Sequence, residues 1–194
     1  MLTPALLAGL ALTACTPTPV VTPTATPSSA PTASASASAT PSPSPAFVIP
    51  DCDSIYSPAL VASLSAEGRT PLGDTSAAGG GGWGTFDAGI EAILSGIVDR
   101  VSCTWILPAS ESGSTTSVAV ADAAARTALL AAFTAGGFAA STTADGDLYS
   151  ISVEEEFITY TESHLLTSEV WIGSAYGFGV AETLTLDTAA VVLP

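Results

Sequence analysis

The sequence predicts an α+β domain, an antiparallel sheet of about five or six strands with two or three helices packed on one side. Several segments after residue 47 alternate apolar and polar residues, which is typical of half-buried strands. Others carry apolar residues at helical spacing and begin at a capping residue. Glycine and aspartate clusters between these segments indicate turns. Together these observations place one α+β domain over residues 47–194.

The first part of the domain is predicted to be a helix, a loop and a second helix. Ser57 can cap a helix whose first residue is Pro58, and Gly68 ends it, so the first helix covers about 58–67. Residues 68–84 are rich in glycine and lack the Lys-Ser/Thr ending of a phosphate-binding loop, so a plain loop is expected. Apolar residues at helical spacing predict a second helix over 86–96.

Two strands and the longest helix follow. In the strand predicted over 98–107, Val101, Cys103 and Trp105 alternate onto one face. Residues 108–113 suit a hairpin connection to a second strand at 114–120. Asp122 is a good cap for an alanine-rich helix over 123–135, which two glycines then end.

The remaining residues are predicted to form strands only. A short strand is expected at 138–142, and Asp145-Gly146-Asp147 is a turn before the strict alternation of Tyr149, Ile151 and Val153. Two further strands are predicted at 157–166 and 169–175. The last apolar segment, near 183–193, is also assigned to a strand.

The two cysteines of the domain are expected to form a disulfide. Cys52 and Cys103 are an even pair in a small domain, which is typical of proteins in oxidising compartments. Two separate thiols are the alternative. A C-x-x-C spacing is absent, so redox or zinc chemistry is not expected.

The first 14 residues have the pattern of an export signal. Residues 5–14 form an apolar run that is too short for the roughly 20 residues of a membrane-spanning helix. The run ends at Leu12-Thr13-Ala14-Cys15, which resembles the lipobox of bacterial lipoproteins. That resemblance implies cleavage before Cys15 and transfer of diacylglycerol to its thiol. No Lys or Arg precedes the run, so either the start lies further upstream or the amino terminus supplies the positive charge. The alternative to a lipoprotein signal is an ordinary secretory signal, whose cleavage would leave a soluble protein.

Residues 15–46 are predicted to be a lipid-anchored, disordered stalk. From residue 16 onward the composition is almost wholly Thr, Pro, Ser and Ala, with eight prolines that deny regular helix or sheet. Such a stalk spans ~30 Å as a coil and ~95 Å when extended. Its Ser and Thr residues are candidates for O-glycosylation.

The whole layout resembles small secreted lipoproteins of actinobacteria, through the lipobox, the stalk, a cysteine that opens the domain before a helix, and Cys103-Thr104-Trp105. The resemblance implies display on the outer face of the cytoplasmic membrane and binding of an envelope protein or small ligand. It carries over no catalytic residue. Two alternatives remain, an envelope hydrolase that uses carboxylates or His164, and an accessory subunit of a membrane transporter or protease.

The charges exclude one class of partner. The chain has 18 acidic residues and three arginines, with a net charge of −15, and residues 1–50 carry none of these charges. Such a domain repels phosphate backbones, so nucleic acid is not an expected partner.

Few residues are candidates for chemistry. The single histidine, His164, lies in a predicted strand beside Glu162, but no G-x-S-x-G motif accompanies it. Glu154, Glu155 and Glu156 are expected to be a solvated edge, because neighbouring strand residues point to opposite faces and the spacing matches no cation loop. Metal and cofactor sites are therefore not predicted. The best ligand-site candidate is an aromatic groove formed by Trp171, Tyr176 and Phe178 among nearby glycines.

Overall fold

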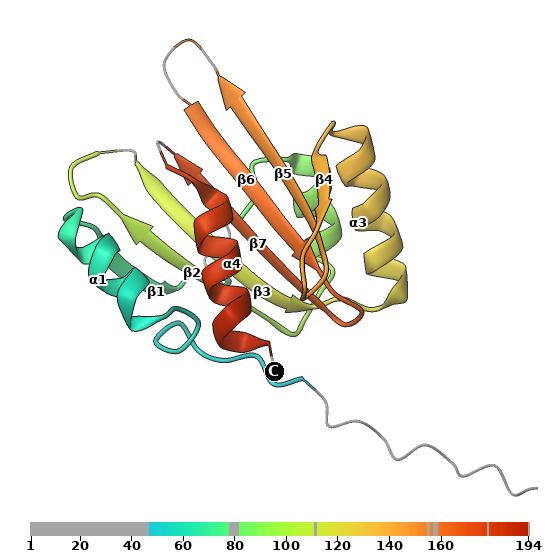
Figure 1. The fold of residues 1–194 in the computed structure, drawn as a ribbon, viewed down its shortest axis with the longest axis horizontal. Helices are drawn as coiled ribbons and strands as arrows, with labels where there is room; N and C mark the ends of the chain where they lie inside the picture. Colours follow the sequence, from blue (N-terminus) through green and yellow to red (C-terminus); the bar gives the residue numbers. More distant parts are fainter. Residues whose placement is uncertain are drawn as a thin grey trace, which may run out of the picture. The chain divides into compact units, whose positions relative to one another are not determined.

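A seven-stranded antiparallel sheet organises the part of the chain that the structure describes (Figure 1). Residues Ser44–Pro194 form one compact unit, and within it the computed structural model describes residues 47–77, 82–110, 112–154, 156, 159–177 and 179–193. The predicted signal peptide, Cys15 and stalk lie outside the described residues. The strand order is β1-β2-β3-β7-β6-β5-β4. The strands are β1 (Thr70–Asp74), β2 (Arg100–Ile106), β3 (Gly113–Val120), β4 (Ala139–Thr142), β5 (Asp147–Glu154), β6 (Thr159–Leu166) and β7 (Val170–Gly177).

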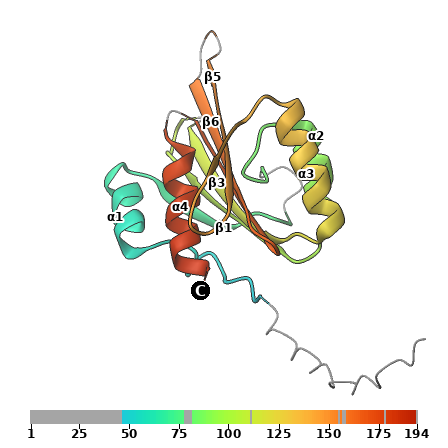
Figure 2. The same cartoon turned by 45° about the vertical axis from the view of Figure 1, so that its right-hand side comes forward.

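Within the described residues, four helices cover the two faces of this sheet. Helices α1 (Pro58–Ala66) and α4 (Ala181–Val192) lie on one face, and α2 (Ala88–Leu94) and α3 (Ala123–Ala135) lie on the other (Figure 2). The predicted α+β class is confirmed. The sheet has one strand more than the upper expectation, and the helices occupy both faces instead of one.

Strand alternation produces a separate apolar core on each face. In β2, Val101, Cys103 and Trp105 point toward α1 and α4, as the alternation predicts. In β7, Trp171 points to the other face and packs with Leu129 and Phe133 of α3. Because both faces bury apolar side chains, the sheet forms the middle layer of three.

Local signals fix the helix starts. Ser57 accepts a hydrogen bond from the backbone N–H of Leu60 at 3.1 Å, and Asp122 accepts one from Ala125 at 2.8 Å. Asp87 caps α2 in the same way, through Gly89 and Ile90. These bonds satisfy N–H groups that have no partner within a helix. The bounds predicted for the third helix, 123–135, are those observed.

The strand predicted near 183–193 is wrong, because this segment is helix α4. Its buried residues recur at helical spacing, and threonine supplies two of them, so counting threonine as polar hides the period. The set is Ala181, Leu184, Thr185, Thr188 and Ala189. Asp187 also accepts hydrogen bonds from the backbone N–H and hydroxyl of Ser57, at 2.8 and 2.5 Å, which joins α4 to the start of α1.

The plain loop predicted over 68–84 is also wrong in part, because it contains β1. This strand lies at the edge of the sheet, carries Pro71, and has an irregular register between Pro71 and Gly73. An edge strand tolerates proline, since one side of its backbone needs no partner. Gly73 has a φ of 74° at this irregularity, a conformation that glycine adopts readily.

Candidate functional site: a cleft at the start of β2

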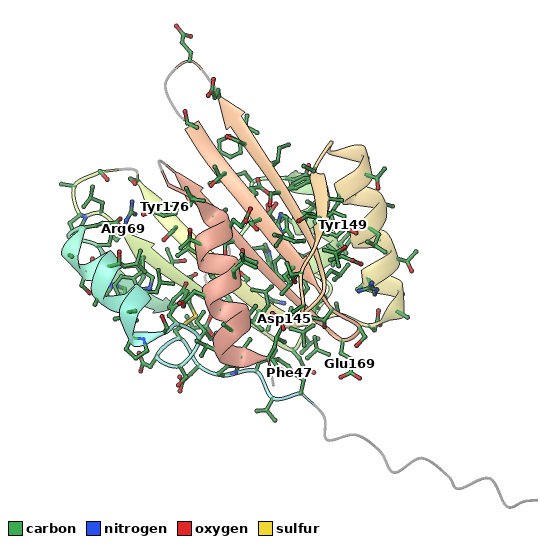
Figure 3. The ribbon with its side chains drawn as sticks, viewed as in Figure 1. Phe47, Arg69, Asp145, Tyr149, Glu169 and Tyr176 are labelled. Carbon is green, nitrogen blue, oxygen red and sulfur yellow. A yellow bond between two sulfur atoms is a disulfide. The ribbon has the colours of Figure 1, made fainter. Side chains whose placement is uncertain are left out.

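A cleft of about 580 Å³ lies where the described chain begins. One wall is the segment 47–52, and the other is formed by residues 98–101 at the start of β2 with Asp74 and Val120. Figure 3 labels Phe47 at this end of the domain. The volume is within the range of ligand-binding clefts, about 300–1,000 Å³.

A second hollow of about 510 Å³ adjoins the first. It shares Val98, Asp99 and Val120 with it and extends between the end of α2 and the start of α3. Its other lining residues are mostly apolar or small: Ile93, Gly96, Ile97, Asp122, Ala124, Ala125 and Ala128. The two hollows together are called the Val98 cleft below.

Two valines at the Val98 cleft are exposed far more than valine usually is. Val48 is 82% exposed and Val98 is 87% exposed. Both line the first hollow, and Val98 lines both. Exposed apolar side chains that gather in a cleft with polar groups beside them are typical of an interaction site.

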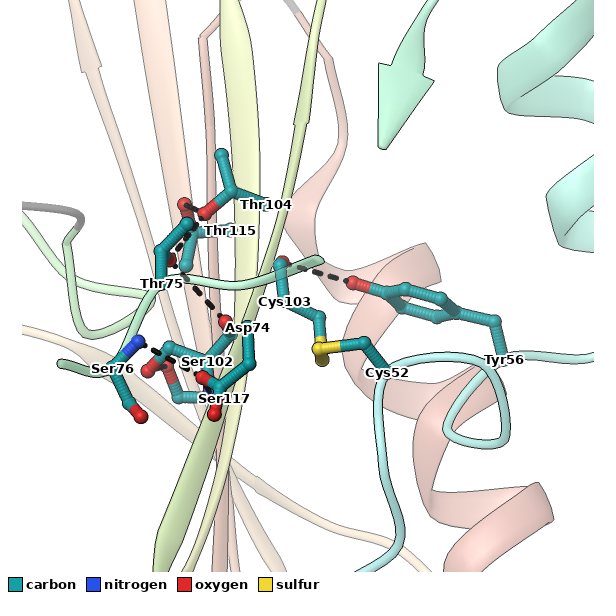
Figure 4. Close-up of a disulfide and its surroundings, with 10 residues drawn as sticks. All are labelled: Cys52, Tyr56, Asp74, Thr75, Ser76, Ser102, Cys103, Thr104, Thr115 and Ser117. Carbon is teal, nitrogen blue, oxygen red and sulfur yellow. Dashed lines mark hydrogen bonds between the residues drawn. A yellow bond between two sulfur atoms is a disulfide. The ribbon is translucent and has the colours of Figure 1, made fainter. Parts of the chain in front are cut away.

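The disulfide predicted between Cys52 and Cys103 is present and holds one wall of the cleft (Figure 4). It joins the segment that precedes α1 to the middle of β2, with a Cα–Cα distance of 5.4 Å. Next to it, the buried hydroxyl of Tyr56 donates a hydrogen bond to the carbonyl of Cys103 at 3.3 Å. Burial raises the pKa of Tyr56 above its usual value of 10.0, so the phenol stays protonated.

Arg100 lines the cleft, but its guanidinium group is used inside the domain. It lies 4.0 Å from the centre of the Trp83 ring and donates hydrogen bonds to the carbonyls of Ile97 and Ser76. A planar guanidinium can stack and donate at the same time. Arg100 thereby anchors the loop before α2.

Asp74 is likewise bound within the fold. Its Oδ1 atom accepts hydrogen bonds from the backbone N–H groups of Ser76 and Ser102, at 2.9 and 3.2 Å. Burial acts to raise the pKa of Asp74, but these two bonds and the charge of Arg100 lower it overall. Asp51 and Asp99 are exposed along the cleft, and so is Asp122, whose Oδ1 atom also caps α3.

A second polar feature, the cluster of His164, Glu162 and Thr85, lies inside the core beneath α2 and α3. Glu162 accepts hydrogen bonds from the hydroxyl of Thr85 and the backbone N–H of Phe86, both at 2.7 Å. The Nε2 atom of His164 is 3.3 Å from the same carboxylate. Glu162 on β6 thus fixes the loop that leads into α2.

His164 is packed among aromatic rings and is 0% exposed. Phe133, Phe138 and Trp171 lie 4.9, 5.2 and 5.8 Å from it, measured between ring centres. Burial lowers the pKa of His164, against the opposing effect of Glu162. In this conformation a substrate cannot reach the imidazole, and its contacts are those of a structural histidine.

The structure does not bring the predicted aromatic groove together. Trp171 and Tyr176 belong to different cores on opposite faces of the sheet. Tyr176 lies beside Arg69 and donates a hydrogen bond to Glu67 at 2.8 Å (Figure 3). Phe178 lies outside the described residues. An odd spacing within one strand puts two side chains on opposite faces, a signal that the sequence already contained.

The other polar candidates are spread over the surface. Glu154 and Glu156 are exposed, and Glu155 lies outside the described residues. Asp147 forms an ion pair with Arg126, with a distance of 3.7 Å between Oδ2 and Nη2. Among the described residues, no three His, Cys, Asp or Glu side chains are grouped to hold a metal ion.

Comparison with known protein families, curated proteins and solved structures gives no match. None of the helices that the structure describes is long and apolar enough to cross a membrane. The Val98 cleft was missed by sequence reasoning, because four parts of the chain that are separated in the sequence form it.

Proposed function

We propose that this chain is a lipid-anchored domain of the bacterial cell envelope that binds an envelope partner through the Val98 cleft. The observation that carries the proposal is the cleft itself, in which two exposed valines lie beside exposed carboxylates at the start of the folded domain. The anchor is Cys15, at the end of the lipobox-like Leu12-Thr13-Ala14-Cys15.

Two features support a position outside the cytoplasm. The pair Cys52–Cys103 forms a disulfide, and such bonds persist mainly in oxidising compartments. The apolar run 5–14 followed by Cys15 resembles the signal of a lipoprotein. A tether of about 30 residues would then let the domain reach partners at ~30–95 Å from the membrane.

The cleft supports binding more than catalysis. Valine side chains contribute affinity when a partner removes them from water, and Val98 is 87% exposed. A hydrolase based on His164 would need substrate access to a side chain that is completely buried. An accessory subunit of a membrane transporter or protease would bind that transporter or protease through the same cleft. This alternative therefore differs from the proposal only in the identity of the partner.

Membrane fractionation tests the anchor. The Cys15→Ser chain should leave the membrane pellet, because it cannot accept the lipid. The matched control is Thr16→Ser, which changes the neighbouring residue but keeps the Cys15 thiol and should remain in the pellet. Continued pelleting of the Cys15→Ser chain would refute lipidation as the means of attachment.

A further inference from the structure

Apolar side chains occur along the whole length of the Val98 cleft, with charged groups between them in the first hollow. At one end Phe47, Val48 and Ile49 line it, and at the other the lining is Ile93 and Ile97 of α2 with the small side chains of α3. Val98 stands between the two hollows and lines both. An extended or helical segment of another protein could place apolar side chains in both hollows at once.

The border of the cleft is negatively charged. Asp51, Asp99 and Asp122 are exposed along it, while the guanidinium group of Arg100 lies against Trp83. The whole chain has a net charge of −15, so the surrounding surface reinforces the negative potential. A partner with basic residues next to apolar ones would match both properties of the cleft.

The same charges argue against other occupants. A second copy of this chain would bring two acidic surfaces together, and an anionic membrane surface would be repelled. The described carboxylates do not form a group that could hold a metal ion. The charges are spread along the cleft, which suits a ligand with several separated cationic groups.

We infer that the Val98 cleft binds a basic, apolar segment of an envelope protein. One apolar side chain of that segment enters between Val48 and Val98, and Lys or Arg side chains lie beside Asp51, Asp99 and Asp122. This inference rests on the proposed function, because it names the chemistry of the partner for the same cleft. It does not depend on the lipid.

A titration of the full-length Cys15→Ser chain tests the inference separately from the anchor. The probe is a fluorescent synthetic peptide of alternating lysine and leucine, followed by anisotropy. Two comparison peptides replace every leucine by serine or every lysine by glutamate. The alternating lysine–leucine peptide should bind most tightly, and its affinity should fall as salt is raised, because screening weakens the charge contacts.

Two cleft variants and two matched controls locate the site. Val98→Ser should weaken binding about tenfold, as expected for the loss of one buried valine. Asp99→Asn should weaken it by about twofold to fivefold. The controls are Leu72→Ser, which removes an apolar side chain that is 53% exposed on β1, and Glu156→Gln, which removes an exposed carboxylate outside the cleft. Both controls should bind like the parent chain.

Three results would overturn the inference. In the first, the lysine–leucine peptide fails to bind, or the glutamate peptide binds as well. In the second, the lysine–serine peptide binds as tightly, which would reduce the interaction to charge alone. In the third, the control variants lose as much affinity as the cleft variants, which would place the contact elsewhere on the acidic surface.

Discussion

Removing the carboxylate of Glu162 should destabilise the domain strongly. The side chain is 3% exposed and is hydrogen-bonded to Thr85, Phe86 and His164. In Glu162→Ala all three groups lose this partner inside the core. Hydrogen bonds to a carboxylate contribute about 1.5–3 kcal/mol, and a buried polar group left without its partner costs about 1–3 kcal/mol, so we expect a loss of about 3–5 kcal/mol in the free energy of unfolding.

Two milder variants divide this effect. Glu162→Gln keeps the shape and one acceptor oxygen, but its amide group donates where the carboxylate accepted, so about 1–3 kcal/mol should be lost. Thr85→Val removes the 2.7 Å hydrogen bond to Glu162 and the acceptor of the Asp87 backbone N–H at 3.0 Å, and should cost about 1–2 kcal/mol. A double-mutant cycle between the two positions should give a coupling of at least about 0.5 kcal/mol.

Urea unfolding of the full chain, followed by tryptophan fluorescence, measures these changes. The matched control is Glu154→Ala, which removes an exposed carboxylate at the end of β5 and should stay within about 0.5 kcal/mol of the parent. The reasoning fails if Glu162→Ala loses no more than this control. It also fails if Glu162 and Thr85 contribute independently, because the structure makes them direct partners.

Three further predictions concern the core. Gly173→Ala should lower the free energy of unfolding by about 1–3 kcal/mol, because its Cβ would collide with the Trp171 ring and come within 2.8 Å of His164. In the same assay the control Gly113→Ala should be nearly neutral, because its Cβ would lie 3.5 Å from the nearest atom. The free energy of unfolding should fall as pH drops below about 6.5, by up to about 1.4 kcal/mol per pH unit, because His164 takes up a proton more readily in the unfolded chain than in the core. In unfolding measured from pH 7.5 to 5.5, His164→Gln should flatten this slope, and an unchanged slope would contradict the burial argument. Reducing the Cys52–Cys103 bond, with its sequence separation of 51, should lower the free energy of unfolding by roughly 4 kcal/mol on the chain-entropy model, and a reductant that leaves the unfolding midpoint unchanged would show that the bond does not stabilise the fold.

Much of the fold could be predicted where short-range chemistry decides it. Helix α3 has a capping aspartate, an alanine-rich body and two terminal glycines, so its bounds follow from the sequence. The alternation in β2 likewise predicts that Val101, Cys103 and Trp105 lie on one face of the strand, as they do. In these segments local preference and tertiary packing agree.

The errors arise where packing overrides or hides the local pattern. Helix α4 buries Thr185 and Thr188 against the sheet, and threonine gives little apolar signal in a sequence. It also has no side-chain cap at Val180, so the usual start signal is missing. Strand β1 is held by pairing with β2 despite Pro71, and this pairing depends on residues 29 to 36 positions away in the sequence.

The candidate site shows the same division. The disulfide could be predicted because only two cysteines occur in the domain. The Val98 cleft could not be predicted, since it combines the start of β2 and the end of β3, which are neighbours in the sheet, with the segment 47–52, which the disulfide attaches to β2. The buried role of His164 also depends on Phe133 and Trp171, which come from different elements.

Intact mass spectrometry of the protein extracted from its own membranes tests the central claim most directly. The account predicts a mature chain whose first residue is Cys15, carrying the added mass of a diacylglycerol group, with Cys52 and Cys103 oxidised. A mature chain that retains Met1, or that begins elsewhere without lipid, would contradict it.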